Sequence, residues 1–167
     1  STDRALINRI TDDYDLYNLT VNYDLGFASL VSTSSYIDID KLQTGYNAQV
    51  VTLASFPATP LEILLPNYRN DAEVFTQEIR LGSNVSDSPL DWTFGVFYSD
   101  SERGFGFSSV ALAGPFTVTA PGSDTILSSE TIAYFGDVSY AFTDRLTLGI
   151  GTRYFEDDRE RQDLVSG

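Results

Sequence analysis

The densest run of ionisable side chains is 156–161, with the sequence EDDRER. Carboxylates spaced this closely on a loop could bind Ca²⁺. The arginines of the same run can instead pair with those carboxylates, and mixed charge clusters of this kind are usually solvated. Asp38 and Asp40 present the same choice on a smaller scale. We therefore expect solvated, partly self-paired charges at 156–161, solvated charges at Asp38 and Asp40, and no metal site at either place.

A second set of charged side chains falls in segments with strand-like alternation. Glu78 and Arg80 are two positions apart, so an extended strand places both on one face. From there they could pair across strands with Asp91, Asp137 or Arg153. We interpret this set as structural rather than as a catalytic carboxylate pair, because nothing in the spacing holds two carboxyls around a substrate.

Residue types and motifs used in catalysis are scarce. The chain has no His and no Cys, which removes the commonest general base, the commonest metal ligand and any thiolate site or disulfide. It also has no Gly-x-Ser-x-Gly motif, no phosphate-binding loop and no dinucleotide fingerprint. The sequence therefore predicts a protein that is not an enzyme and needs no cofactor.

The overall charge narrows the choice of partners. Across 167 residues, 24 Asp and Glu face 10 Lys and Arg, so the formal net charge is −14 and the sequence pI is about 4.1. Such a chain repels phosphate backbones, which excludes nucleic acid as an expected partner. Its apolar runs are far shorter than the roughly 20 residues of a membrane-spanning helix. A mean hydropathy of −0.11 is compatible with strands that alternate between apolar and polar residues.

The elements that must position these side chains are strands. Aromatic residues make up 13% of the chain and fall mostly in alternating segments with Val, Ile and Thr, which is an all-β composition. Each expected strand is longer than the usual five or six residues and close to the length that a tilted strand needs to cross a bilayer. The expected strands are 13–24, 27–39, 73–82, 90–102, 130–142 and 146–158.

The expected connections alternate between short and long. Short turns are expected at 24–26, 83–89 and 143–145, and long loops at 40–72 and 103–129. Short turns at one end and long loops at the other are typical of an outer-membrane barrel, with periplasmic turns and extracellular loops. A soluble Greek-key sandwich can also mix loop lengths, so both interpretations stay open.

Prolines support the placement of the long loops. Residues 40–72 contain Pro57, Pro60 and Pro66, and residues 103–129 contain Pro115 and Pro121 as strand breakers.

The two faces of the later strands differ in chemistry. In 90–102, 130–142 and 146–158, one face is apolar and the other is small or polar. This division fits lipid on one side and an aqueous lumen on the other, although in a sandwich the apolar faces would pack together. The faces of 27–39 stay unassigned. The aromatic residues expected at the membrane interfaces are Trp92, Tyr98, Tyr134, Tyr140 and Tyr154. The polar residues expected in the lumen are Glu78, Arg80, Asp137 and Arg153.

Three stretches resemble the barrel of TonB-dependent outer-membrane receptors and occur in that family's order. The first is 23–36, YDLGFASLVSTSSY. The second is 75–98, FTQEIRLGSNVSDSPLDWTFGVFY, with a Gln-Glu-hydrophobic-Arg-Leu run, a polar turn and Trp-x-x-Gly-x-x-Tyr. The third is similar to the family's Thr-Asp-Arg-Leu-Thr-Leu turn followed by Gly-x-Arg-Tyr, which is 151–154 in this chain.

The resemblance implies a barrel of about 22 strands closed by a plug domain. It further implies import of a ferric siderophore, vitamin B12 or a carbohydrate across the outer membrane of a Gram-negative bacterium. The chain lacks a plug and a TonB-contacting segment, so we expect residues 1–167 to be an internal piece of the barrel wall. Its fold class would be all-β, an antiparallel up-and-down meander that forms a segment of a transmembrane barrel.

The expected partners follow from this interpretation. They are outer-membrane lipid, a small-molecule ligand such as a ferric siderophore, and the TonB system through parts of the receptor outside this chain. Two alternatives remain open. The chain could be a self-assembling β fragment that forms an extracellular fibre or an oligomer through open strand edges, or a small complete barrel of about eight strands.

Overall fold

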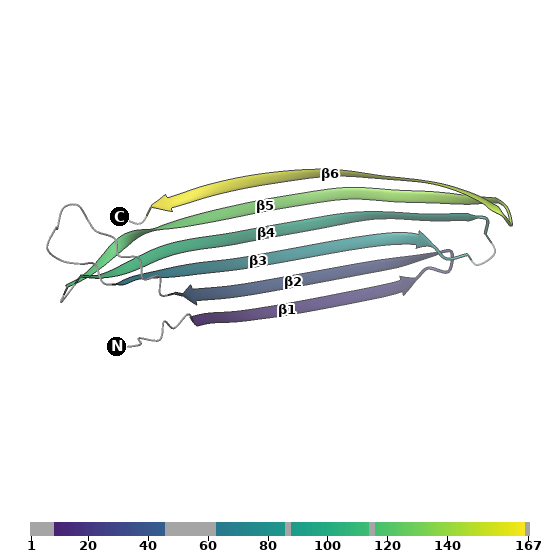
Figure 1. Ribbon diagram of the computed structural model, residues 1–167. Helices are drawn as coiled ribbons and strands as arrows, with labels where there is room; N and C mark the ends of the chain where they lie inside the picture. The colour runs from purple at the N-terminus through teal and green to yellow at the C-terminus, as the bar shows by residue number, and fades with distance from the viewer. Residues whose placement is uncertain (1–8, 46–62, 86–87, 114–115, 166–167) are drawn as a thin grey trace.

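The computed structural model describes residues 9–45, 63–85, 88–113 and 116–165. They form one antiparallel sheet in which each strand pairs with its neighbours in sequence (Figure 1). The strands are β1 (Arg9–Asp24), β2 (Ala28–Thr44), β3 (Ile63–Ser83), β4 (Leu90–Ala113), β5 (Phe116–Thr143) and β6 (Leu146–Val165). The predicted all-β, up-and-down meander is therefore confirmed. None of the described residues belongs to a helix long and apolar enough to cross a membrane.

The strands are longer than the sequence pattern predicted. β4 and β5 continue to Ala113 and Phe116, so the prediction of a long loop at 103–129 was wrong. The register steps from Phe107↔Ser123 to Ser109↔Ala120, and Pro121 falls in the resulting bulge of β5. A bulge tolerates proline because its residues do not need a full set of ladder hydrogen bonds.

The predicted loop at 40–72 is also shorter than expected. β2 runs on to Thr44 and β3 begins at Ile63, while 46–62, with Pro57 and Pro60, lie outside the described residues. Pro66 lies inside β3 rather than in a loop. Thr44 pairs with Asn67, so Pro66 is past the described end of β2, and on the other side it pairs with Ser109 of β4.

The three short turns lie together at one end of the sheet, opposite the start of β1 and the end of β6 (Figure 1). In the first turn, Gly26 has a φ of 85°, and its N–H donates to Asp24 Oδ1 at 2.7 Å. Asn84 Nδ2 of the second turn donates to the same oxygen at 3.0 Å. In the third, Arg145 N donates to Thr143 Oγ1 at 3.3 Å. The predicted turns at 24–26, 83–89 and 143–145 are thus where the chain reverses.

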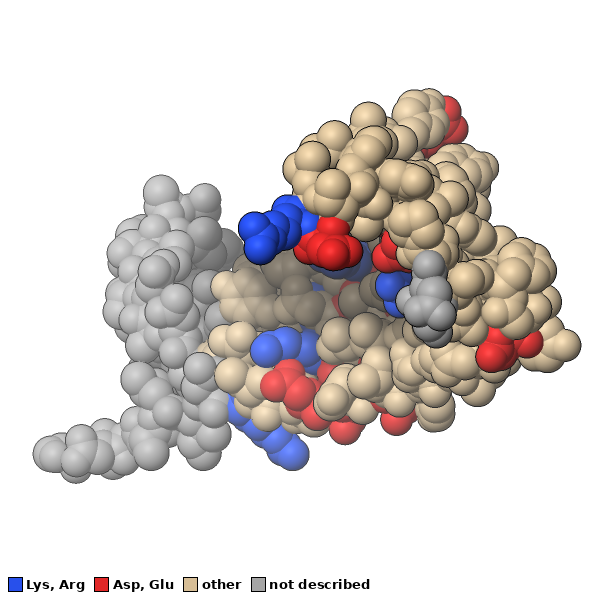
Figure 2. Space-filling view, turned by 90° about the vertical axis from the view of Figure 1, so that its right-hand side faces the viewer, with Lys and Arg blue, Asp and Glu red and all other residues tan. Residues whose placement is uncertain are grey.

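The sheet curves around a hollow, which gives it a concave and a convex face (Figure 2). On β4 and β5, the side chains on the same face as Ser99 and Thr131 are on average more buried than those on the same face as Phe94 and Tyr134. The first set therefore lies on the concave face and the second on the convex face. Among the described residues, the only buried hydrophobic side chains are Ala28 and Ala133.

Large apolar side chains on the convex face are left uncovered, as Ile150 shows with 79% of its surface exposed. A sandwich would bury these side chains against a second sheet. The described residues form a single sheet, so the soluble sandwich interpretation does not hold for them.

The convex face is divided along the strands. From the short turns outward it carries an apolar band, which on β4 comprises Leu90, Trp92, Phe94, Val96 and Tyr98 and on β6 ends at Tyr154. Beyond the band, the convex face of each strand carries acidic residues. The first acidic residues past it are Asp15, Asp38, Glu73, Asp100, Glu130 and Glu156.

Basic residues of the paired strands lie mostly on the concave face. Those on the concave face are Lys41, Arg80, Arg103, Arg153, Arg159 and Arg161, whereas Arg9 and Arg69 lie on the convex face. Lys and Arg side chains accordingly lie in and around the hollow in Figure 2. The acidic excess of the described strands is therefore concentrated on the convex face.

Candidate functional site

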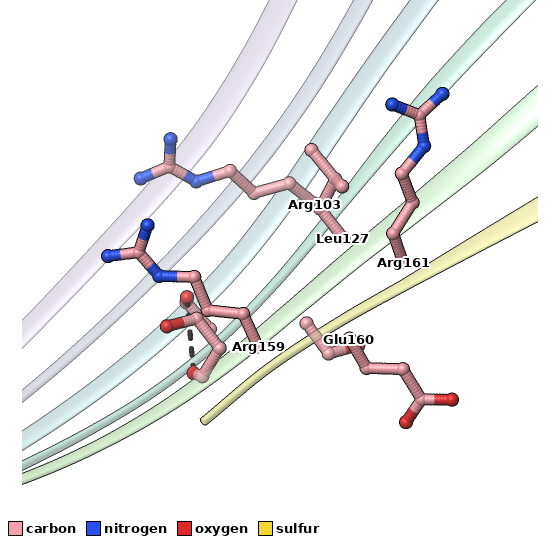
Figure 3. Close-up of a pocket in the computed structure, with 8 residues that line it drawn as sticks. Arg103, Leu127, Arg159, Glu160 and Arg161 are labelled. Atoms are coloured by element: carbon pink, nitrogen blue, oxygen red, sulfur yellow. Dashed lines mark hydrogen bonds between the residues drawn. The ribbon is translucent and has the colours of Figure 1, made fainter. Parts of the chain in front are cut away.

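A depression of about 490 Å³ lies on the concave face near the end opposite the short turns. Its concave-face residues are Ser101 and Arg103 of β4, Leu127 and Ser129 of β5, and Arg159 and Arg161 of β6, which we call the arginine groove. In Figure 3, the side chains of Arg103, Leu127, Arg159 and Arg161 extend to one side of the sheet, and Glu160 extends to the other.

Strand pairing explains how residues so far apart in sequence meet. Arg103 pairs with Leu127, and Leu127 pairs with Arg161, so the three residues form one row across β4, β5 and β6. Ser101, Ser129 and Arg159 form the adjacent row. Paired residues on a pleated sheet share a face, and rows two residues apart are neighbours on it. The groove is therefore a direct product of the strand register.

The charge run 156–161 lies within β6 and not beyond its end. Alternation places Asp157, Arg159 and Arg161 on the concave face and the remaining acids of the run on the convex face. Neighbouring carboxylates therefore point away from each other. Among the described residues, no three His, Cys, Asp or Glu side chains are grouped to hold a metal ion.

Arg159 and Arg161 are each held by an acidic residue two positions along the same strand. Arg159 Nε lies 2.6 Å from Asp157 Oδ2, and Arg161 Nε lies 3.0 Å from Asp163 Oδ1. The Nη2 atoms of the two arginines reach the same carboxylates at 2.5 and 3.0 Å. Both contacts follow from the period of two, which puts residues i and i+2 side by side on one face.

Hydroxyl groups of β5 hold the two carboxylates in turn. Ser129 and Thr131 donate to Asp157 Oδ1 at 2.8 and 2.9 Å, and Thr125 donates to Asp163 Oδ1 at 2.9 Å. Both acids lie beyond Tyr154, where the apolar band ends. The hydrogen bond from Ser129 lowers the pKa of Asp157, with further lowering by Arg159 and Thr131. Arg161 and then Thr125 lower the pKa of Asp163.

Arg103 differs from the other two arginines. Within the described part of the chain, no carboxylate lies at ion-pair distance from it. Its neighbour Leu127 is 46% exposed and separates it from Arg161. The groove therefore offers guanidinium donors and one apolar surface. This combination suits an anion with a hydrophobic body, since guanidinium forks match carboxylate and phenolate oxygens.

The structure separates the two sets of residues predicted from the sequence. The predicted interface aromatics all lie on the convex face, and they are Trp92, Tyr98, Tyr134, Tyr140 and Tyr154. The predicted lumenal residues all lie on the concave face, and they are Glu78, Arg80, Asp137 and Arg153. The roles themselves, at a membrane and in a lumen, stay predictions.

Pairing among the predicted polar residues is local rather than across strands. Arg80 Nε contacts Glu78 Oε1 at 2.7 Å along β3, instead of reaching Asp91 or Asp137. The Arg153 guanidinium lies 5.8 Å from the centre of the Phe97 ring. Asp91 accepts a hydrogen bond from Ser83. These contacts fit a structural role for the set, although the partners differ from those expected.

Three groove residues were not predicted as site residues, because all of them fall within the predicted loop 103–129; they are Arg103, Leu127 and Ser129. A signal was present at the start of this segment. Arg103, Phe105 and Phe107 alternate with glycines and a serine, which is a period of two. Glycine and serine are also common in loops, so they conceal this alternation.

Comparison with known proteins decides the family. Residues 1–166 match the family described as "TonB dependent receptor-like, beta-barrel". The chain belongs to the TonB-dependent receptors. This is a family of outer-membrane receptors of Gram-negative bacteria.

One solved structure agrees in fold. The ferric yersiniabactin uptake receptor FyuA from Yersinia pestis matches this TonB-dependent receptor chain with a TM-score of 0.68 at 16% identity. The match covers 99% of this chain and 26% of FyuA, so the chain spans about a quarter of that receptor's length. The siderophore receptor PiuA from Acinetobacter baumannii gives a TM-score of 0.45 at 10% identity, over 92% of this chain and 30% of PiuA. Comparison with curated proteins gave no match.

Proposed function

We propose that residues 1–167 form part of the barrel wall of an outer-membrane receptor that imports a ferric siderophore or a similar nutrient. The observation that carries this proposal is the opposition of the two faces, with an uncovered apolar band on one and the arginine groove on the other. Family membership supports it. The proposed chemistry is binding and transport, without catalysis or a resident cofactor.

The convex apolar band would face lipid. On β4 it runs from Leu90 to Tyr98, about the nine to eleven residues that a tilted strand needs to cross a bilayer. Trp92 lies near the short turns and Tyr98 at the acidic end, which suits rings at the two interfaces. Tyr134, Tyr140 and Tyr154 share this face, and we propose the same interfacial role for them.

The concave face would line the lumen. The part of the lumen wall at the height of the apolar band would be formed by Glu78, Arg80, Asp137 and Arg153. The arginine groove would lie nearer the extracellular side. The short turns would then be periplasmic, as in other outer-membrane barrels. The TonB system would act through parts of the receptor outside this chain.

The edge strands fit a larger barrel better than the two alternatives. Within the described residues the sheet is open, so it is not a closed barrel of about eight strands. Every described side chain of β1 is exposed, and so are nearly all of those on β6. We propose that these strands pair with further strands of the same barrel, because open edges in a bilayer leave backbone groups unsatisfied. No comparison favours a self-assembling fibre.

Iron uptake tests the proposed function. Gram-negative cells producing the receptor with all of its domains would be starved of iron and given radiolabelled ferric chelates of several classes. We expect uptake from at least one chelate, and loss of that uptake when either the receptor or the inner-membrane TonB system is removed. Uptake that is the same with and without the receptor for every chelate would contradict the proposal.

A further inference from the structure

The three arginines of the arginine groove are not equivalent. Arg159 and Arg161 are each neutralised by a carboxylate on their own strand, whereas Arg103 has no such partner among the described residues. A guanidinium paired with a carboxylate must exchange that contact, or share it, before it binds another anion. Arg103 has no such contact to exchange among the described residues, so its guanidinium is the most available of the three for a ligand.

The acidic partners are themselves held in place. Two hydroxyl groups of β5 bind Asp157, and one binds Asp163, so neither carboxylate is a freely moving surface acid. The Asp157 side chain is 16% exposed, compared with 77% for Arg159. The contacts with the two carboxylates use Nε and Nη2 of each arginine, while a guanidinium carries five N–H donors. Donors of Arg159 and Arg161 therefore remain for a second anion.

We propose that the arginine groove binds an anionic ligand, with Arg103 as the first contact and with Asp157 and Asp163 restraining Arg159 and Arg161 as secondary contacts. This inference rests on the proposed function, in which the concave face meets the ligand. The chemical class is a chelate or small molecule with several carboxylate or catecholate oxygens around an apolar body. The oxygens take the guanidinium donors, and the exposed side chain of Leu127 packs against the body.

The pairing of Arg159 and Arg161 with carboxylates affects which anions the groove selects. An ion of single charge gains little by displacing Asp157 or Asp163, because it would exchange one charge-assisted contact for another. A polyanion can contact Arg103 and reach the free donors of Arg159 and Arg161 together. The groove is therefore expected to favour a polyanion over an uncharged chelate of the same size, and the preference should weaken as salt is raised.

Binding by three probes tests the inference. The probes are a trianionic iron(III) tris(catecholate), an uncharged iron(III) tris(hydroxamate) and metal-free citrate, added to the purified receptor with all of its domains. For Arg103→Gln we expect at least about a tenfold loss of affinity for the tris(catecholate) and for citrate, since a lost hydrogen bond to a charged group has that effect or more. Affinity for the tris(hydroxamate) should not change.

Two further variants complete the test. Arg69→Gln is the matched control, because Arg69 lies on the convex face and pairs with Asp71 at 3.1 Å. It should leave all three affinities unchanged. Asp163→Asn releases Arg161 and should raise the affinity for the trianion. Resistance of the folded receptor to unfolding in sodium dodecyl sulfate checks that each variant is assembled.

The outcomes separate this inference from the proposed function. If ferric chelates are taken up but Arg103→Gln changes no affinity, or lowers those of charged and uncharged chelates equally, the anion site is wrong and the uptake function stands. If citrate binds through Arg103 but no ferric chelate is taken up, the anion site stands and the uptake of iron is wrong. A wild-type preference for the uncharged chelate also overturns the anion site.

Discussion

Phe94 pairs with Gly136 on the convex face, and at the next position Phe135 pairs with Gly95 on the concave face. In both pairs the phenyl ring lies where a side chain on the glycine would be. Rings that cover glycines stabilise neighbouring strands of a sheet. The β4–β5 hairpin is thus locked by two reciprocal contacts, one on each face.

Alanine at either glycine should loosen this hairpin. A Cβ at Gly95 or Gly136 would collide with the facing ring, and displacing the ring should lower the free energy of unfolding by about 1–3 kcal/mol. Urea unfolding of the receptor in lipid or detergent would measure the change. Gly149→Ala is the control, because a Cβ there meets its nearest atom, Ser139 Cβ, at an ordinary 3.4 Å. Equal effects of all three substitutions would show that the rings are not the cause.

Acid should weaken the contact between β5 and β6 through Asp157. Its pKa in the folded chain is lowered, chiefly by the Ser129 hydroxyl and by Arg159. A lowered pKa means that the stabilisation is complete above the ordinary Asp value of about 3.9 and is lost as the pH falls through the folded-state pKa. Asp157→Asn should therefore flatten the decline in stability below about pH 4. Asp158→Asn, which removes a convex-face charge, should not reproduce that flattening.

The sequence could predict the six strands and their turns because both depend on local pattern. Alternation marks a strand wherever one face is apolar, and Asp24 with Gly26 has the chemistry of a tight turn. The extension of β4 and β5 could not be read in the same way. Residues 103–129 form strands because β4 and β5 pair with each other, which is not a property of the local pattern. A bulge in β5 also accommodates Pro121, which the pattern alone marks as a strand breaker.

The candidate site depends on the same register between β4, β5 and β6, which the sequence pattern did not predict. Arg103 and Arg161 are 58 positions apart, yet both pair with residue Leu127, one from each side. No spacing rule within one strand predicts that meeting. Alternation did suffice to assign Trp92 and Arg153 to opposite faces, because the period of two holds through each long strand.

Cysteine labelling should reveal the orientation of the sheet. These 167 residues contain no Cys, so labelling of an introduced thiol is compared with labelling of the same receptor without it. Asp124→Cys, on the side of the long β4–β5 hairpin, should react with a membrane-impermeant maleimide on intact cells. Asp144→Cys, in the short β5–β6 turn, should react only after the outer membrane is permeabilised. The reverse pattern would mean that the short turns face outward.

A lysine in the middle of the convex apolar band should prevent stable insertion. Ile150 is 79% exposed on this face, with Leu148 and Thr152 as its neighbours along β6. If lipid covers it, Ile150→Lys should cost about 2–4 kcal/mol, the range measured for basic residues at the bilayer midplane of barrels. The measurement is the unfolding free energy in lipid vesicles, together with the folded fraction in the outer membrane. Asp158→Lys places the same side chain on the same strand and face, but beyond Tyr154 in the acidic region, and should cost far less. If the two lysines were tolerated equally, the band would not face lipid, and the barrel-wall role proposed for this chain would fail with it.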